Sequence, residues 1–213
     1  MQRLRLNFSR GEELKFLSHL DLMRLWERAL RRAGLPLAYS EGFSPHPQIA
    51  LAAPLSVGVT SQAELMDVFL SRWVPPQSFT AQVSNQLPRG IDLLEAWPVG
   101  PKAPSLQSQI RFIEYKVEVK AEQGREEIEL ALQSFLSAEE IPWHHFRDTG
   151  ARHYDLRALV DNLWLIDCQD SLCALGMRLR CDEKGAGRPE QVTKALGFSQ
   201  HPESIHRTKL ILS

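Results

Sequence analysis

Four arginines near the N-terminus are the residues best suited to bind an anion. They are Arg24, Arg28, Arg31 and Arg32. In a helix they fall on one side, because residues three and four apart are neighbours on the helix surface. Each guanidinium can bind two oxygens at once, so the group favours phosphate or carboxylate ligands. A solvated helix face without a ligand is the alternative interpretation.

A stiff loop with a histidine follows these arginines. The sequence Gly-Phe-Ser-Pro-His-Pro occupies residues 42–47, and its two prolines restrict the backbone on both sides of His46. A basic helix beside a rigid loop predicts a recognition surface to which Ser44 and His46 contribute. An ordinary turn is the other interpretation.

Acid–base chemistry is a second hypothesis for this region. His19 and His46 could exchange protons near neutral pH, and Asp21 stands close to His19 in the sequence. Asp21 already has a structural explanation, because Ser18 and Asp21 have the spacing of a helix capping box. We therefore expect binding rather than catalysis, with an enzyme that uses His19 or His46 as the alternative.

Two segments of the second half could also contact an anion. Gly187 and Arg188 end a glycine-rich loop before a predicted helix, where free backbone N–H groups can hold a phosphate. The spacing fits neither a Walker loop nor a dinucleotide fingerprint, and an ordinary loop-to-helix junction is the competing interpretation. Arg207 lies on the predicted last strand, on the face opposite His206.

Residues 144–157 combine histidines with charged side chains. The histidines are His144, His145 and His153. They could bind a metal, but adjacent residues of a strand point to opposite faces, which disfavours a shared site. We expect instead a polar connection held by Tyr154, Asp155 and Arg157, and these three residues are also candidates for binding the substrate.

The cysteines predict neither a metal site nor a cofactor. Cys168, Cys173 and Cys181 match no zinc-finger or iron–sulfur spacing. An odd number of cysteines behind a charged, strand-like N-terminus predicts reduced thiols in the cytoplasm rather than a secreted protein. Cys168 and Cys173 could face each other across a predicted hairpin turn.

Composition sets the class of protein. The chain has 213 residues, 43% hydrophobic and 24% charged, with a net charge of −1. These values are ordinary for a globular protein with its own core. Binding to nucleic acid would need a local basic patch, because the net charge supplies none. No apolar run has the roughly 18 residues of a membrane helix, so no membrane partner is expected.

The pattern of elements predicts an α+β fold. The first half predicts a strand at residues 4–8, a helix at 18–34, strands at 47–57 and 65–73, a helix at 78–87 and a strand at 91–99. In the helix, Leu22, Trp26, Ala29 and Leu30 recur at helical spacing and predict a buried stripe. Proline and glycine at positions 98–104 predict a linker.

The same order returns after the linker. Strands are predicted at 113–119, 156–168, 171–181 and 205–212, with helices at 126–136 and 189–196. We therefore expect two tandem ferredoxin-like (βαββαβ) halves with antiparallel sheets. Their bounds are 1–99 and 110–213, with 100–109 as a proline-rich linker.

Short motifs along the whole chain carry a resemblance to a known family. They are Ser-His-Leu-Asp at 18–21, Arg-Ala-Leu-Arg-Arg at 28–32, Gly-Phe-Ser-Pro-His-Pro at 42–47, Pro-Leu at 54–55 with Gly58, then 61–64, 154–157, 188–189, 195–197 and 207–208. In this order they resemble the radical-SAM-linked uncharacterised family, a bacterial domain of unknown function. Ser44 departs from the asparagine expected there, which weakens any role for a side-chain amide.

The resemblance implies a partner. Members of the family occur fused to, or encoded beside, a radical SAM protein, often near RNA-processing genes. Because this chain has no cluster motif, it cannot itself be the radical SAM catalyst. We expect an accessory protein that recognises RNA or another anionic substrate for that partner, with Trp26 or Phe43 stacking on a base if exposed. A docking module without nucleic-acid binding is the third hypothesis.

Overall fold

The chain has a mixed α+β fold with mostly antiparallel strand pairs, which agrees with the predicted class. In the computed structural model, residues 1–100, 102–147, 150–169 and 171–213 are described. The chain divides into two units, Met1–Ile110 and Arg111–Ser213. None of the helices in these described ranges is long and apolar enough to cross a membrane.

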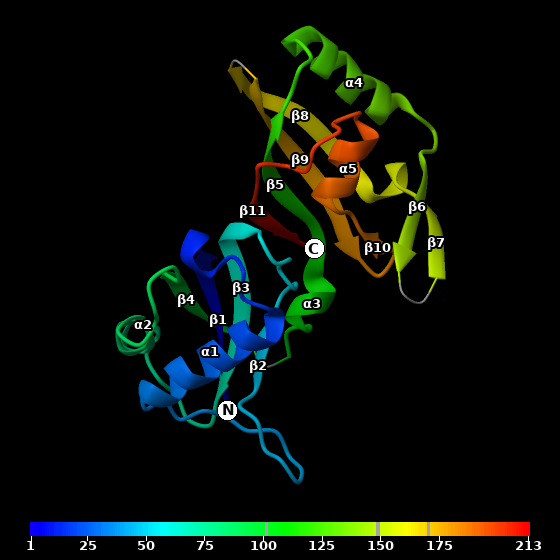
Figure 1. The fold of residues 1–213 in the computed structure, drawn as a ribbon. Coiled ribbons are helices and arrows are strands. Elements are labelled where there is room, and N and C mark those ends of the chain that lie inside the picture. The colour runs from blue at the N-terminus through cyan, green and yellow to red at the C-terminus, as the bar shows by residue number, and fades with distance from the viewer. Residues whose placement is uncertain (101, 148–149, 170) are drawn as a thin grey trace. The chain divides into compact units, whose positions relative to one another are not determined.

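The sheet of the first unit is built around its first strand. Its strands in chain order are β1 (Gln2–Arg10), β2 (Ile49–Leu51), β3 (Thr60–Leu70) and β4 (Leu93–Val99). β1 pairs with both β3 and β4, and β2 pairs with β3, so the order is β4-β1-β3-β2 with antiparallel ladders (Figure 1). β2 is much shorter than the predicted strand, because Pro54 and Gly58 turn the chain after it.

Two helices cover one face of this sheet and bury the core of the first unit. They are α1 (His19–Arg32) and α2 (Pro76–Ser84), preceded by the short 3-10 turn η1 (Glu12–Leu14). Leu6 and Phe8 of β1 meet Trp26 of α1, and the Phe8 and Trp26 ring centroids are 4.8 Å apart. Trp26 is 0% exposed. The buried stripe of α1 is therefore confirmed, and Trp26 is not placed to stack on a base.

The opposite face of β1 carries two arginines. Arg3 and Arg5 both bind Asp67 of β3, which is 1% exposed. The Arg3 Nε donates to Asp67 at 2.9 Å, and the Arg5 Nε donates at 2.8 Å. The carboxylate therefore offsets two buried positive charges.

The predicted linker is held by the same arginine network. Arg3 donates to the carbonyl oxygens of Ala103 and Pro104, each at 2.8 Å. Residues Leu106–Gln109 then form the short helix α3, whose Leu106 is buried. The segment after β4 is thus part of the first unit.

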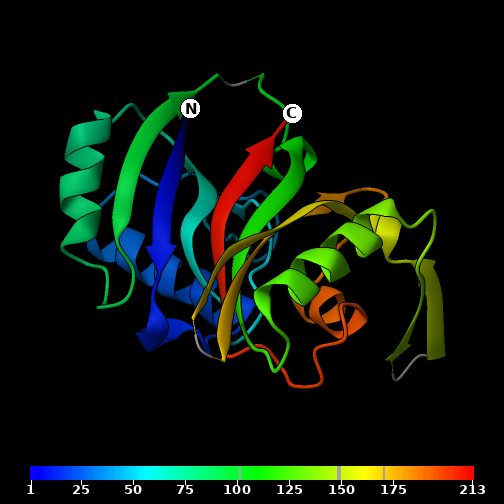
Figure 2. The ribbon, with the colours of Figure 1, turned by 90° about the horizontal axis from the view of Figure 1, so that it is seen from above.

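The second unit contributes a second set of antiparallel strands. Its strands are β5 (Ile110–Lys120), β8 (Val160–Gln169), β9 (Leu172–Asp182), β10 (Gly185–Ala186) and β11 (Ser204–Leu212). β9 pairs with β8, β5 and β10, and β5 also neighbours β11, which gives the order β8-β9-β5-β11. The helices α4 (Arg125–Ser137) and α5 (Pro189–Ala195) lie on one face of this sheet (Figure 2).

A hairpin in the second unit was not predicted. β6 (Pro142–Arg147) and β7 (Gly150–Asp155) pair with each other and precede the 3-10 turn η2 (Arg157–Leu159). The sequence predicted only a polar connection here, because the hairpin has no regular apolar alternation. β10 likewise occupies a segment predicted as loop. Asp170, in the turn predicted between β8 and β9, lies outside the described residues.

Candidate functional site

The start of α1 is set by its cap. The Ser18 hydroxyl accepts the backbone N–H of Asp21 at 3.2 Å and donates to the Asp21 carboxylate at 2.7 Å. Asp21 also lies 3.5 Å from the Arg24 guanidinium. Both contacts, and the favourable place of a carboxylate at a helix N-terminus, account for Ser18 and Asp21 without a ligand.

The end of α1 places the arginines. The backbone of Gly34 has φ +67°, which permits the left-handed turn that ends the helix. Arg31 and Arg32 therefore stand in the last turn, where cations interact favourably with the helix dipole. The position of the helix end agrees with the sequence prediction.

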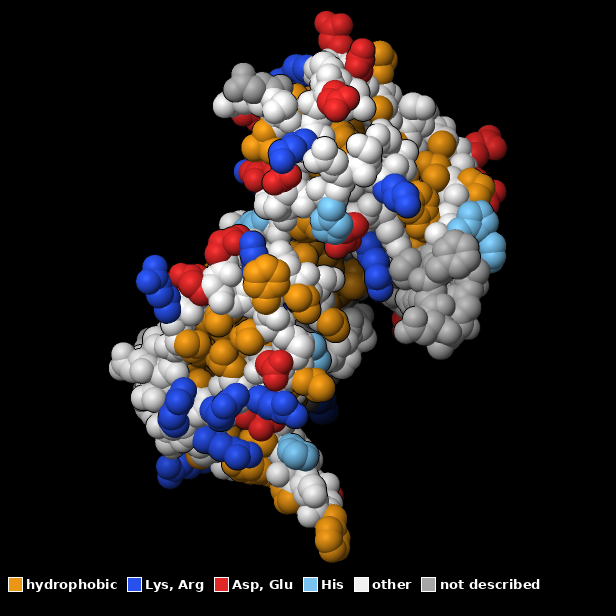
Figure 3. All heavy atoms as spheres, in the orientation of Figure 1, with side chains coloured by type: hydrophobic (Ala, Val, Ile, Leu, Met, Phe, Trp, Pro, Cys, Tyr) orange, Lys and Arg blue, Asp and Glu red, His pale blue; other side chains and the backbone are white. Residues whose placement is uncertain are grey.

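The four arginines form one exposed face, here called the arginine face: Arg24, Arg28, Arg31 and Arg32. Figure 3 shows basic side chains gathered over α1. Arg28 donates to the carbonyl of Arg24 at 3.1 Å, and Arg32 donates to the carbonyl of Gln86 at 3.0 Å. These bonds occupy part of each fork and leave exposed N–H groups that can donate to a ligand.

A projecting segment stands beside the arginine face. Residues 38–48, here called the arm, leave the sheet after α1 and return at β2. The Arg31 guanidinium carbon lies 5.9 Å from the ring centroid of Tyr39, at the root of the arm. Ser44 and His46 lie in the arm and are exposed. The structure therefore brings the arginine face and the loop motif together, as the sequence predicted, and adds Tyr39 between them.

The two histidines of the region are both accessible to solvent. His19 begins α1 and His46 lies in the arm, and both are exposed. Among the described residues, neither imidazole has a hydrogen-bond partner. A general base is usually oriented by a second group. The arrangement suits binding better than proton transfer.

Three predicted site residues organise the backbone of the second unit. The Asp155 carboxylate accepts the N–H groups of Ile141, Arg157 and Ala158 at 2.9, 2.9 and 3.2 Å. Arg157 donates to the carbonyl oxygens of Leu136 and Val160. The Tyr154 hydroxyl donates to Gln191 of α5 at 2.6 Å. These contacts explain the three residues as ties between the hairpin, η2 and the helices.

We predict that Asp155→Ala lowers the free energy of unfolding by about 2–3 kcal/mol, because three backbone N–H groups lose their acceptor. The measurement is urea denaturation. Asp167→Ala is the matched control, since the exposed Asp167 also accepts a backbone N–H, from Cys168, and should cost much less. Equal stability of the two variants would contradict the structural role of Asp155.

The other residues predicted to contact an anion are less accessible to a ligand than the arginine face. The N–H of Gly187 donates to the carbonyl of Arg180 at 2.9 Å, so it is not free for a phosphate. Arg188 is exposed at the start of α5. Arg207 is buried, with its guanidinium carbon 5.9 Å from the Tyr115 ring centroid. Of these residues, Arg188 has the most accessible side chain.

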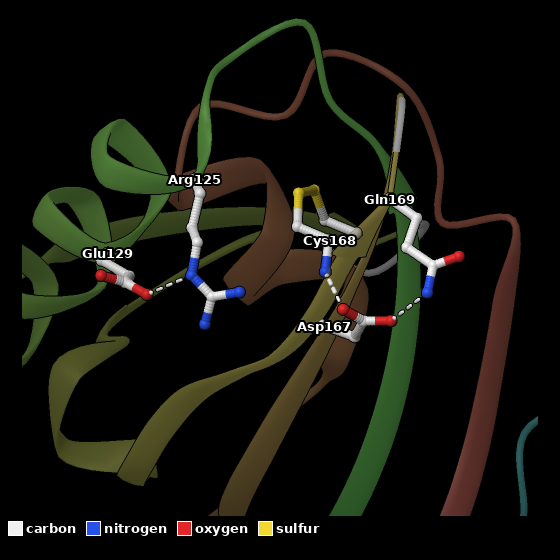
Figure 4. The surroundings of a disulfide bond; sticks show 6 residues. Arg125, Glu129, Asp167, Cys168 and Gln169 are labelled. Atoms are coloured by element: carbon white, nitrogen blue, oxygen red, sulfur yellow. Dashed lines mark hydrogen bonds and ion pairs between the residues drawn. A yellow bond between two sulfur atoms is a disulfide. The ribbon is translucent and has the colours of Figure 1, made fainter.

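The prediction of reduced thiols is wrong for one pair. The β8–β9 register sets Cys168 opposite Cys173 with Cα atoms 4.1 Å apart, and the two form a disulfide. Figure 4 shows this bond, with Arg125 and Glu129 of α4 nearby. Cys181 is not bonded, and burial raises the pKa of its thiol.

The geometry of the hairpin histidines gives metal binding no support, because the two described rings share a hydrogen bond. The register pairs His144 with His153, and their Nδ1 atoms lie 2.5 Å apart. The side chain of His145 is outside the described residues. Among the residues that are described, no group of three or more His, Cys, Asp or Glu is placed to hold an ion. The expected absence of a metal stays a prediction.

The fold and the site define an α+β protein with an exposed arginine-rich helix. Its sequence matches the family described as an uncharacterized protein conserved in bacteria (DUF2344) over residues 3–189, so the chain belongs to that family. No curated protein sequence matches it.

Solved structures resemble the chain at low identity. A chain in the crystal structure of a Cbf5-Nop10-Gar1 complex has a TM-score of 0.53 at 10% identity, covering 98% of this chain and 48% of that one. A chain in the structure of an H/ACA RNP bound to a substrate RNA containing 2'-deoxyuridine has a TM-score of 0.49 at 10% identity, covering 98% and 47%. This chain therefore spans about half the length of these relatives. The first likeness concerns the fold alone.

Proposed function

We propose that the chain recognises an anionic substrate, with RNA as the leading class, for a radical SAM partner enzyme. The observation that carries this proposal is the arginine face, whose four side chains are all exposed on one helix. Guanidinium forks match phosphate oxygens in pairs, and an RNA backbone offers a row of them. With a net charge of −1, attraction to RNA has to come from this local surface.

The exposed arginines of α1 differ from the buried arginines of β1 in their partners, and this difference supports a ligand for the arginine face. The guanidinium groups of Arg3 and Arg5 donate hydrogen bonds to the buried carboxylate of Asp67, and Arg3 also donates to backbone carbonyl oxygens. Among the described residues, Arg24 alone of the arginine face has a carboxylate partner, Asp21, and their side chains are 68% and 50% exposed. Exposed pairs of this kind are weak, so a phosphate can compete for the guanidinium.

Each unit is a ferredoxin-like half in this proposal. Support comes from the strand orders, β4-β1-β3-β2 in the first unit and β8-β9-β5-β11 in the second, with two helices on one face of each sheet. A ferredoxin-like unit has this order when its strands are numbered along the chain. The fold by itself indicates no substrate, because one fold serves many functions.

The radical SAM partner rests on the motif resemblance. Membership in the bacterial family is shown, and the match over residues 3–189 includes the arginine helix and the arm. An accessory role agrees with a chain that lacks a cluster motif of its own. A cytoplasmic location belongs to the same proposal.

The experiment is photo-crosslinking of the pure chain to RNA that contains 4-thiouridine, followed by mass spectrometry of the peptides. We expect crosslinks in α1 and in the arm. Crosslinks confined to residues 111–213, or no crosslink at all, would refute the assignment of this surface. The exposed helix α4, which has its own arginine, serves as the internal comparison.

The same samples test the enzymatic alternative. The RNA is examined for cleavage and for modified nucleosides, with His19→Ala and His46→Ala alongside. We expect no change in the RNA. A product that disappears in either variant would favour an RNA-cleaving or RNA-modifying enzyme over a recognition module.

A further inference from the structure

The root of the arm is firmly attached to the sheet. The backbone of Phe69 in β3 accepts the N–H of Ala38 at 2.8 Å and donates to the carbonyl of Gln48 at 3.0 Å. Gln48 in turn donates to Ala38 at 2.8 Å. The arm therefore starts from a fixed point on the strand ladder rather than from a free loop.

The arm is braced along its length. The N–H of Ser40 donates to the carbonyl of His46 at 2.9 Å, and the N–H of His46 donates to the Ser40 hydroxyl at 3.1 Å. Pro45 and Pro47 remove backbone freedom on the returning side. Gly42 has φ +126°, a conformation that side-chain-bearing residues rarely adopt, so the tip requires glycine. These features hold the tip in one shape before any ligand arrives.

An aromatic side chain stands at this tip. Phe43 is 109% exposed, so its ring has no packing role in the fold. Contact with an apolar or aromatic surface would remove this ring from water. A braced arm loses little conformational entropy when such a contact forms.

The arginines beside the arm indicate which kind of ligand could contact Phe43. Arg31 of the arginine face packs over Tyr39 at the arm root. A ligand that uses both surfaces carries negative charge and also presents an apolar or aromatic face. Unpaired RNA has both, whereas paired bases in a duplex are stacked on one another and hidden from the ring.

We infer that Phe43 is a stacking platform for an unpaired base of RNA whose phosphates are bound by the arginine face. This inference rests on the proposed function and narrows its substrate to RNA with a single-stranded stretch. The arm supplies the base contact and α1 supplies the phosphate contacts.

The test compares variants of the full chain on two probes by fluorescence anisotropy. The probes are a single-stranded RNA that contains 2-aminopurine and the matching duplex. Phe43→Leu keeps an apolar side chain but removes the ring, and Phe43→Tyr keeps the ring. Leu130→Ala is the control, because Leu130 of α4 is also a largely exposed apolar residue.

We expect Phe43→Leu to weaken single-strand binding about tenfold and duplex binding less than twofold. Phe43→Tyr and Leu130→Ala should stay within about twofold of the wild type, and only chains with a ring should quench 2-aminopurine.

Two results would overturn the inference. If Phe43→Leu binds the single strand as the wild type does while loss of the arginine face abolishes binding, RNA recognition stands and the stacking platform fails. The ring then belongs to an apolar pocket of a protein partner. If the wild type binds neither probe, the proposed function and the stacking platform fail together.

Discussion

Asp67→Ala is expected to lower the free energy of unfolding of the first unit by about 3–5 kcal/mol. Asp67 is 1% exposed, and it is bound by the guanidinium groups of Arg3 and Arg5. Without the carboxylate, two buried positive charges face each other without a counter-charge. The cost is that of leaving charges unpaired, which exceeds the net worth of the pair itself.

The effect should also reach the segment after β4. Arg3 holds the carbonyl oxygens of Ala103 and Pro104 while it binds Asp67. Once Asp67 is gone, Arg3 is no longer fixed in that orientation. Hydrogen exchange read by mass spectrometry should therefore show faster exchange in α3 as well as in β1 and β3.

The measurement is urea denaturation with hydrogen exchange as the readout for the first unit. Glu129→Ala is the control, because the exposed pair of Arg125 and Glu129 on α4 should change stability by less than about 0.5 kcal/mol. A loss of less than about 1 kcal/mol for Asp67→Ala would show that the buried network does not stabilise the unit.

Replacing the whole arginine face by alanine is expected to weaken RNA binding on the order of a hundredfold at low salt. Each phosphate contact releases counterions, so the logarithm of affinity falls with the logarithm of salt concentration. For single strands the slope is about −0.7 per contact, and four lost contacts should flatten it by up to about 3. Binding that remains should depend little on salt.

A four-lysine variant distinguishes the effect of positive charge from that of the paired guanidinium donors. A variant with four lysines keeps the charge but loses the paired donors of arginine, so it should keep most of the salt slope and lose part of the affinity. Arg125→Ala is the matched control, since Arg125 is an exposed arginine of the second unit. Circular dichroism must show an intact helix in each variant.

Unchanged affinity and an unchanged slope across salt concentrations, with the fold intact, would rule out phosphate contact by this face. The docking hypothesis would then gain support. Asp21 could retain its role in either case, because its contacts with Ser18 and Arg24 belong to the helix itself.

Helices and strands were predictable from the sequence where neighbouring residues determine their start, their end and their buried side. The capping residues Ser18 and Asp21 start α1, Gly34 ends it, and the apolar spacing identifies its buried side. The alternation in β1 and β5 likewise predicted strands. Helical spacing alone placed the four arginines on one face, because the period of a helix depends on the backbone and not on distant contacts.

Sequence patterns do not predict the role of a side chain when that role depends on its burial or on its hydrogen-bond partners. Trp26 was a candidate for stacking on a base, but it is buried in the core of the first unit. Asp155 and Arg157 have backbone partners in neighbouring turns, so a structural role accounts for both, and a contact with substrate stays a prediction. The hairpin of β6 and β7 has no regular apolar alternation, so no strand period marked it in the sequence.

The sequence by itself determined most of the long helices and strands, the arginine face and the stiffness of the loop that carries His46. The facing of Cys168 and Cys173 across a hairpin turn is local, and the sequence predicted it. Only the tertiary structure decided which distant residues meet. The β1–β3 register joins Arg5 to Asp67, and Phe69 fixes the root of the arm. Such pairs depend on strand register, which is set by how whole faces pack, and no residue type or spacing within one element encodes it.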